Sequence, residues 1–255
     1  MNYYKGNGLY EYLEQHNCQN FYFVKGDMWW LIYGDKKSNP KLLVLACAVT
    51  NDEYRFNSFS KSEERASKCL DFFAEQTGLP KLVVRFSGEA GEIVNVKIKQ
   101  DEEPYKEITM KALKDVFAET GLDIPTGKRT THKYLNTETS SAYHDWQRAE
   151  LGDAITVCDL DLVKWKQGKP LQIYELKRSY YDLDEWTPFT DDYANFSLVS
   201  KFAKRAGMRF QIVYNVRTKK PFFDDVSRLK LFDFDHQKKD EVRDLGIVRI
   251  EDFVQ

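Results

Sequence analysis

The stretch from Asp161 to Lys177, DLVKWKQGKPLQIYELK, contains two apolar segments joined by the polar turn KQGKP. A short turn of this kind folds two strands into a hairpin. Asp161 begins the first strand and Glu175 lies near the end of the second, so the hairpin brings these carboxylates together. Glu175 and Lys177 are two residues apart, and side chains at this spacing share one face of a strand. The pattern therefore predicts two carboxylates and one ammonium group converging beside a buried sheet.

Three buried charges at a strand end cost several kcal/mol unless they pair or bind a cation. The carboxylates of Asp161 and Glu175, with the backbone carbonyl of Leu176, form a hard-oxygen site suited to Mg²⁺, with Mn²⁺ as an alternative. Lys177 could position or deprotonate an attacking water, or neutralise negative charge that develops in the transition state. These residue types in this pattern favour metal-assisted hydrolysis of a phosphodiester.

The segment resembles the PD-(D/E)xK nuclease superfamily, in which an acid, a hairpin and a (D/E)xK triplet follow one another. It is most similar to the nuclease motif of type I restriction motor subunits, where a Gly-x-Pro turn also leads to an apolar-Glu-Leu-Lys strand. The resemblance implies a restriction-endonuclease-like mixed sheet flanked by helices. It also implies that Asp161 and Glu175 are metal ligands, that Lys177 is the catalytic lysine and that the substrate is DNA. It covers 17 residues directly.

Other acids are alternative members of the metal site. Leu160 stands where the superfamily has proline before the acid, and Asp159 lies two residues before Asp161 on the same expected face. Many members of the superfamily carry a further acid on the preceding helix, for which this sequence offers Glu138, Asp145 and Glu150. Surface exposure is the simpler interpretation of each of these three.

The sequence around the motif is that of an α/β protein. Apolar runs predict strands at Lys41–Val49, Leu82–Phe86, Ala154–Trp165 and Phe210–Val216. Helical spacing predicts helices at Ser62–Thr77, Tyr105–Thr120, Ser140–Glu150 and Ala194–Ala206. The turn-rich stretch DIPTGKRTT separates two expected domains, an N-terminal α/β module over residues 1–122 and a nuclease-like domain over residues 132–255.

The first half of the chain echoes the second. Asp27 begins an apolar strand, a polar turn ending in Pro40 and a further apolar strand, as Asp161 does with Pro170. Aligning the prolines puts Leu45 at the position of Glu175 and Cys47 at that of Lys177. One hypothesis is two tandem modules, of which the first is degenerate and serves in binding, assembly or support. The other is that two unrelated βαβ units look alike. The tandem-module hypothesis requires that the two halves share one strand order.

Basic side chains indicate where nucleic acid would bind. Arg217, Lys219 and Lys220 follow the strand after the motif hairpin, a suitable place to hold phosphates beside a cleaving site. The net charge of −2 argues against a protein that coats nucleic acid indiscriminately, but it allows a local basic surface.

Composition limits the class of protein. The 42% hydrophobic content of 255 residues supplies a core for one large or two modest domains. The longest apolar run, from Leu42 to Val49, is far shorter than the roughly twenty residues of a membrane span. The four cysteines have no CxxC spacing, and no basic segment followed by an apolar one opens the chain. We therefore expect a cytoplasmic protein with free thiols and no membrane partner.

The sequence leaves three functions open. The first is a Mg²⁺-dependent nuclease acting in restriction, phage biology or repair. A second is a non-catalytic nucleic-acid- or protein-binding module that keeps the nuclease fold, in which Lys177 would tolerate glutamine. A small-molecule enzyme is the weakest, since the chain has no glycine-rich phosphate loop and no nucleophile elbow. A single site cuts one strand, so double-strand cleavage would require a homodimer, a companion subunit or sequential nicking.

Overall fold

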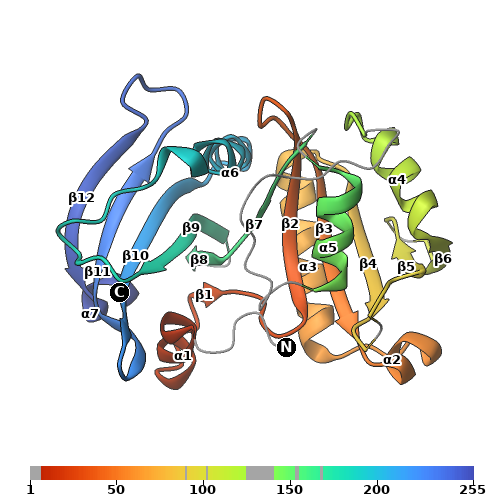
Figure 1. Cartoon of the computed structure of the whole chain (residues 1–255), viewed down its shortest axis with the longest axis horizontal. Coiled ribbons are helices and arrows are strands. Elements are labelled where there is room, and N and C mark those ends of the chain that lie inside the picture. Colours follow the sequence, from red (N-terminus) through yellow and green to blue (C-terminus); the bar gives the residue numbers. More distant parts are fainter. Residues whose placement is uncertain (1–6, 90, 102, 125–140, 153–154, 167–168) are drawn as a thin grey trace. The chain divides into compact units, whose positions relative to one another are not determined.

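The computed structural model describes residues 7–89, 91–101, 103–124, 141–152, 155–166 and 169–255. The expected fold class is confirmed, because the chain forms two mixed β-sheets flanked by helices (Figure 1). The chain divides into two compact units. Unit 1 contains Val24–Asp159, and unit 2 joins the N-terminal segment up to Phe23 with Leu160–Gln255. Unit 1 is therefore inserted in the sequence of unit 2.

The sheet of unit 1 has six strands in the order β6-β5-β4-β3-β2-β7. Only β3 and β4 are parallel, and the other neighbours are antiparallel. The strands are β2 (Met28–Asp35), β3 (Pro40–Val49), β4 (Lys81–Ser87), β5 (Asn95–Lys99), β6 (Lys106–Thr109) and β7 (Ile155–Asp159). Helices α2 (Asn51–Phe56) and α3 (Lys61–Thr77) connect β3 to β4, and α4 (Met110–Glu119) and α5 (Ala142–Glu150) complete the unit.

The core of unit 1 follows from its sequence pattern. Strand β3 is apolar throughout its middle because both faces of the sheet are covered. Trp30 donates a hydrogen bond to a carbonyl of α3, whereas Tyr33 contacts the Tyr143 hydroxyl of α5, and residues an odd number apart face opposite sides of a strand. Figure 1 shows α3 and α5 on opposite faces of this sheet. Helix α3 ends at Gly78, whose φ of 61° suits glycine.

The sheet of unit 2 also has six strands, in the order β1-β8-β9-β10-β11-β12. Only β9 and β10 are parallel. Its strands are β1 (Phe21–Tyr22), β8 (Leu162–Lys166), β9 (Lys169–Ser179), β10 (Arg209–Lys219), β11 (Phe222–Phe234) and β12 (Val242–Arg249). The 3₁₀ turn η2 (Thr190–Asp192) and helix α6 (Tyr193–Arg205) connect β9 to β10, while α1 (Gly8–Gln15) and α7 (Ile250–Val254) lie at the ends of the chain.

The two sheets share one strand order and one pattern of directions. In each, a crossover helix ending at a left-handed glycine, Gly78 or Gly207, joins the central parallel pair. The tandem-module hypothesis requires this common order. One of the two edge strands of each sheet, however, comes from the other half of the chain. Strand β1 precedes β2 but pairs with β8, and β7 precedes β8 but pairs with β2.

The structure differs from the sequence expectations in three places. Tyr105–Thr120 is not one helix, because residues 106–109 pair with β5 as strand β6 and α4 begins only after its N-cap Thr109. The expected strand Ala154–Trp165 is broken at Leu160 and Asp161, and its parts β7 and β8 join different sheets. Helix α5 and β7 thus belong to unit 1 rather than to a domain over residues 132–255.

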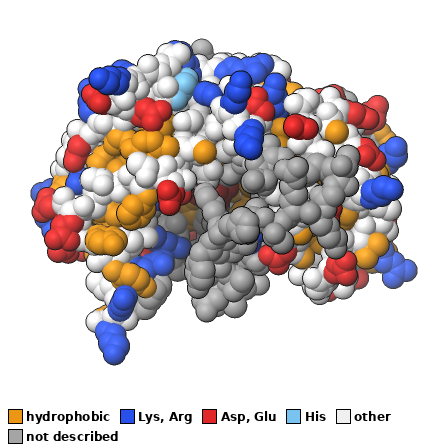
Figure 2. Space-filling view, turned by 45° about the horizontal axis from the view of Figure 1, so that its top comes forward, with side chains coloured by type: hydrophobic (Ala, Val, Ile, Leu, Met, Phe, Trp, Pro, Cys, Tyr) orange, Lys and Arg blue, Asp and Glu red, His pale blue; other side chains and the backbone are white. Residues whose placement is uncertain are grey.

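No helix in the described ranges is long and apolar enough to cross a membrane. On the face drawn in Figure 2, acidic and basic side chains are interspersed, with hydrophobic side chains exposed between them. The large exposed aromatic side chains of unit 2 are Tyr180, Tyr181, Phe189 and Phe223 among the described residues.

Candidate functional site

The β8–β9 hairpin carries the predicted motif. Its register pairs Leu162 with Tyr174 and Val163 with Ile173, so Asp161 and Glu175 are the next opposing pair at the open end of the hairpin. The side chain of Glu175 is buried, with 8% of its surface exposed. The register therefore places the two acids opposite each other in the hairpin.

Two hydrogen bonds hold Asp161 at the break between β7 and β8. Its Oδ2 accepts from the Leu176 N–H at 2.8 Å, and its backbone carbonyl accepts from the Tyr10 hydroxyl at 2.7 Å. Tyr10 lies on α1 and is itself buried, with its ring stacked on Phe23. Because the N–H and C=O of one strand residue point to the same side, the Leu176 carbonyl is directed toward Asp161 as well.

Lys177 bridges two carboxylates. Its Nζ lies 3.0 Å from Glu175 Oε1 and 3.3 Å from Asp192 Oδ2. The ring of Phe196 on α6 lies 5.2 Å from the same nitrogen. The three charged side chains are 8% (Glu175), 26% (Lys177) and 29% (Asp192) exposed, so the cluster opens to solvent at its Lys177 and Asp192 side.

The donor set fits a magnesium ion. Asp161 and Glu175 offer carboxylate oxygens and Leu176 a carbonyl, which are the oxygen ligands that Mg²⁺ takes from proteins while it keeps several waters. The Lys177 ammonium lies beside Glu175 and balances the charge of this buried carboxylate. In the described ranges no group of three or more His, Cys, Asp or Glu is arranged to hold a metal ion.

The alternative acids that the structure describes belong to unit 1. Asp159 ends β7 and pairs with Leu31 in the sheet of unit 1. Asp145 is 65% exposed and pairs with Arg148, and Glu150 pairs with Lys114 at 2.9 Å. All three acids belong to unit 1, whereas Asp161 and Glu175 belong to unit 2. Glu138 lies outside the described residues.

The predicted phosphate-binding residues divide into two kinds. Lys219 and Lys220 are exposed at the β10–β11 turn, where the Lys219 Nζ lies 4.5 Å from the Tyr180 ring. Arg217 instead donates from Nε to the buried Asp224 at 2.8 Å. Arg178 binds the same carboxylate at 2.7 Å.

Strand alternation separates this arginine pair from the carboxylate site. Arg178 is adjacent to Lys177 in β9, so its side chain points to the opposite face of the sheet. Its carboxylate partner, Asp224, also accepts from the Gly8 N–H at the start of α1. Arg217 and Arg178 thus tie β9, β10 and β11 to α1, on the face opposite Glu175 and Lys177.

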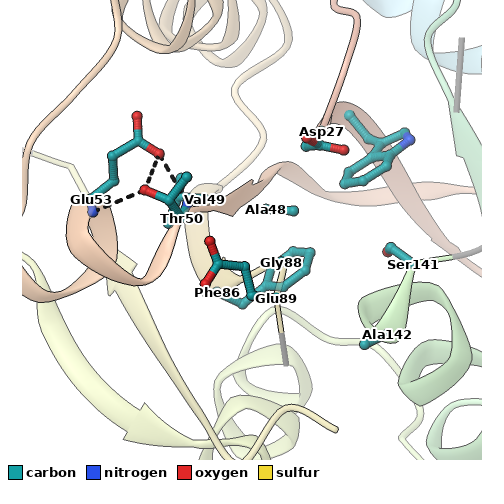
Figure 3. Close-up of a pocket in the computed structure, with 11 residues that line it drawn as sticks. Asp27, Ala48, Val49, Thr50, Glu53, Phe86, Gly88, Glu89, Ser141 and Ala142 are labelled. Carbon is teal, nitrogen blue, oxygen red and sulfur yellow. Dashed lines mark hydrogen bonds between the residues drawn. The ribbon is translucent and has the colours of Figure 1, made fainter. Parts of the chain in front are cut away.

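A cavity of about 330 Å³ lies in unit 1 (Figure 3). Its walls include Trp29, Phe86 and Ser141, and three carboxylate side chains, Asp27, Glu53 and Glu89. Figure 3 shows Glu53 turned toward Thr50, which donates to it from its backbone N–H and its hydroxyl, both at 2.9 Å. None of the predicted site residues lines this cavity.

Sequence reasoning missed two residues that contact the site, Tyr10 and Asp192. Tyr10 is 151 residues away from Asp161, and no local pattern reports that contact. A signal for Asp192 exists in the repeat: it lies 15 residues before Gly207, as Glu63 lies 15 residues before Gly78.

Comparisons with known proteins identify no relative. No family model matches the chain, and no curated protein matches it. The crystal structure of a sex pheromone staph-cAM373 precursor aligns with 96% of this chain and 90% of its own, at 10% identity and a TM-score of 0.21. The C-terminal domain of the sex pheromone staph-cAM373 precursor from Staphylococcus aureus aligns with 87% of this chain and 70% of its own, at 9% identity and a TM-score of 0.20. Scores this low carry no argument about fold or function.

Proposed function

We propose that this chain is a Mg²⁺-dependent nuclease that hydrolyses phosphodiester bonds in DNA. The observation that carries the proposal is the cluster in unit 2, where Asp161 and Glu175 oppose each other and the Lys177 Nζ lies 3.0 Å from Glu175. The order of elements agrees with it, since an acid, a hairpin, a Glu-x-Lys strand, a crossover helix and a parallel strand follow one another. The preference for DNA comes from the resemblance of the motif.

Each residue of the cluster has a separate task. Asp161, held in place by the Leu176 N–H, and Glu175 would hold the metal ion with the Leu176 carbonyl. Bound Mg²⁺ supplies Lewis-acid polarisation of the phosphate and a more acidic water. Lys177 would orient the attacking water or stabilise negative charge on the phosphate oxygens, because its ammonium is fixed beside the metal-binding carboxylate. Mn²⁺ has the same ligand preference and would substitute.

Substrate contacts would come from the β10–β11 turn. Lys219 and Lys220 are exposed there, but strand alternation places Lys219 on the face of Arg217, opposite Glu175 and Lys177, whereas Lys220 belongs to the turn itself. Arg217 is committed to the buried Asp224. We therefore assign the phosphate contact of this turn beside the cluster to Lys220. Arg217 would support the turn by holding β10 to β11.

Unit 1 would support cleavage without taking part in it. It has the strand order of unit 2, but Leu45 and Cys47 occupy the positions of Glu175 and Lys177. Both are fully buried, so this position offers no ligand to a metal ion. The free cysteines suit a reducing cytoplasm. A second copy or a companion subunit would be needed for simultaneous cleavage of both strands.

The test is a cleavage assay on supercoiled plasmid and on single-stranded DNA, with Mg²⁺, Mn²⁺ or EDTA. Wild type, Lys177→Ala and the matched control Lys166→Ala are compared, since Lys166 is an exposed lysine of the same hairpin. We expect metal-dependent cleavage by wild type and control, and a loss of at least about 100-fold in Lys177→Ala. Equal cleavage by folded Lys177→Ala would refute the assignment of the site. Nucleic-acid binding without cleavage by any of the three would favour the binding module instead.

A further inference from the structure

Lys177 has a second counter-ion that the motif does not contain. Asp192 approaches its Nζ to 3.3 Å from the last position of η2, directly before α6. The loop that carries Asp192 is fastened to the sheet: Trp186 stacks on Tyr214 at 4.2 Å, and the Lys230 Nζ donates to the Trp186 carbonyl at 3.1 Å. Directly after Asp192, the Tyr193 ring packs on Phe234 at 5.4 Å, so the connection is anchored to the sheet on both sides of Asp192.

The proposed chemistry creates a need for this counter-ion. In the structure Glu175 is the nearer partner of Lys177, but in the proposed nuclease the oxygens of Glu175 bind a divalent cation. A cation on Glu175 weakens its attraction for the ammonium and repels the ammonium directly. Lys177 would then swing toward solvent, since a lysine side chain is flexible and strongly hydrated. A second carboxylate on the far side of the ammonium opposes that movement.

Unit 1 contains a similar ion pair, in which the cation is an arginine. Glu63 occupies the position of Asp192, counted back from the glycine that ends each crossover helix. Its Oε1 binds the Nε of Arg85 at 2.7 Å, and Arg85 pairs in register with Cys47, the counterpart of Lys177. An acid in the first turn of α3 (Glu63) or directly before α6 (Asp192) therefore contacts a cation of the sheet in both units, although unit 1 has Leu45 at the position of Glu175.

We infer that Asp192 is a positioning residue that keeps the Lys177 ammonium at the reaction centre when Glu175 binds the metal ion. The inference rests on the proposed function and extends its site from three side chains to four. It assigns Asp192 to Lys177 and not to the metal, because the contact that the structure gives Asp192 is to the ammonium.

The experiment compares Asp192→Asn with Asp192→Glu and the matched control Asp191→Asn, an exposed acid one residue earlier. Cleavage kinetics are measured at saturating Mg²⁺, and Mg²⁺ binding is titrated without substrate for these variants and for Glu175→Gln. We expect kcat of Asp192→Asn to fall by about 10- to 100-fold with KM for DNA within about twofold, because the misplaced group acts on the chemical step. Asp192→Glu should recover most of the activity, and Asp191→Asn should match wild type.

The metal titration separates positioning from metal ligation. Asp192→Asn should bind Mg²⁺ with wild-type affinity, whereas Glu175→Gln should lose it. A wild-type kcat in Asp192→Asn would overturn the inference and leave the nuclease proposal standing. Loss of Mg²⁺ affinity equal to that of Glu175→Gln would overturn it too, since Asp192 would then be a ligand. Absence of cleavage by wild type on any substrate would overturn the proposed function, and the inference with it.

Discussion

A single carboxylate, Asp224, organises the face of unit 2 opposite the candidate site. Only 2% of its side chain is exposed, yet it accepts hydrogen bonds from Arg178, Arg217 and the Gly8 backbone N–H. Burial alone would raise the pKa of Asp224, but the hydrogen bond from Arg217, the charge of Arg178 and the bond from Gly8 outweigh it and lower the pKa. The folded protein therefore stabilises the ionised form of Asp224.

The lowered pKa of Asp224 predicts a loss of stability in acid. A carboxyl whose pKa is lower in the folded state contributes stability above its unfolded pKa of about 3.9, and the contribution disappears as the pH falls through the folded value. Asp224→Asn should lower the free energy of unfolding by about 3 kcal/mol at neutral pH. The difference between wild type and variant should shrink below about pH 4. Urea unfolding at a series of pH values measures it, and a difference that is constant with pH would contradict the prediction.

Gly8 is required by the same contact. A Cβ at this position would lie 2.8 Å from the Asp224 Cβ and 3.0 Å from its carbonyl oxygen. Neither atom is the end of a flexible side chain, so Gly8→Ala should destabilise the protein by about 1–3 kcal/mol. Gly91→Ala is the control, since a Cβ there meets nothing within 4 Å, and it should change stability by less than about 0.5 kcal/mol. Equal unfolding midpoints for the two variants would show that α1 can move away from Asp224.

At the scale of elements, an acid in each crossover connection, Glu63 of α3 or Asp192 of η2, forms an ion pair with a cation of its sheet. In unit 1, Arg85 of β4 is fully buried, binds Glu63 of α3 and donates to the Ser58 carbonyl at 2.5 Å. The ring of Phe59 covers its guanidinium at 4.3 Å. Burial raises the pKa of Glu63 while the charge of Arg85 opposes the rise. The Arg85–Glu63 pair is enclosed, whereas the Lys177–Asp192 pair of unit 2 is open to solvent.

This enclosure predicts a structural role for the Arg85–Glu63 pair. Arg85→Met should cost about 3–5 kcal/mol, because it leaves Glu63 buried without its partner. The double variant Arg85→Met/Glu63→Leu should recover most of that loss, since two apolar side chains can fill the same space. A double-mutant cycle in urea measures the coupling, and the cleavage rate per folded molecule should stay unchanged. Loss of cleavage in the folded double variant would contradict the supporting role proposed for unit 1.

At the scale of the whole molecule, the chain is a pair of similar sheets with exchanged outer strands. Unit 2 needs the N-terminal segment, because β1 pairs with β8, and α1 supplies Tyr10 to Asp161 and its first N–H to Asp224. Unit 1 is continuous from Val24 to Asp159. Tyr22 pairs with Val163 in antiparallel register, so Phe23 and Leu160 leave the β1–β8 pair at the same end.

This arrangement predicts that unit 1 can be removed. Joining Phe23 to Leu160 through Asn-Gly closes a four-residue loop before Leu162, the register partner of Phe23, and should yield a protein that unfolds cooperatively. Residues 160–255 alone should not, because they lack α1 and β1. Circular dichroism during thermal unfolding distinguishes the two proteins. A cooperative transition of 160–255 would show that the N-terminal segment is dispensable for the fold of unit 2.

Most elements of this fold can be predicted from the sequence, because their signals are local. Helical spacing and a following glycine delimit α3 and α6 to within about two residues, and the apolar run of β3 marks a strand that is covered on both faces. The Glu175-Leu-Lys177 triplet places an acid and a base on one face, since a strand alternates its side chains. The opposition of Asp161 and Glu175 in the hairpin register follows from the short turn between their strands.

Which sheet a strand joins is decided only by the tertiary structure. Strands β7 and β8 read as one apolar run, but β7 pairs with β2 and β8 with β1, through backbone hydrogen bonds that carry little sequence signature. The same holds for Tyr10 and Asp192, which reach the site from segments that no local pattern connects to it. The sequence by itself thus determined the elements and the acid-hairpin-acid-lysine order, because these depend on neighbours along the chain. The tertiary structure decided the exchange of outer strands and the second counter-ion of Lys177, because these depend on contacts between distant segments.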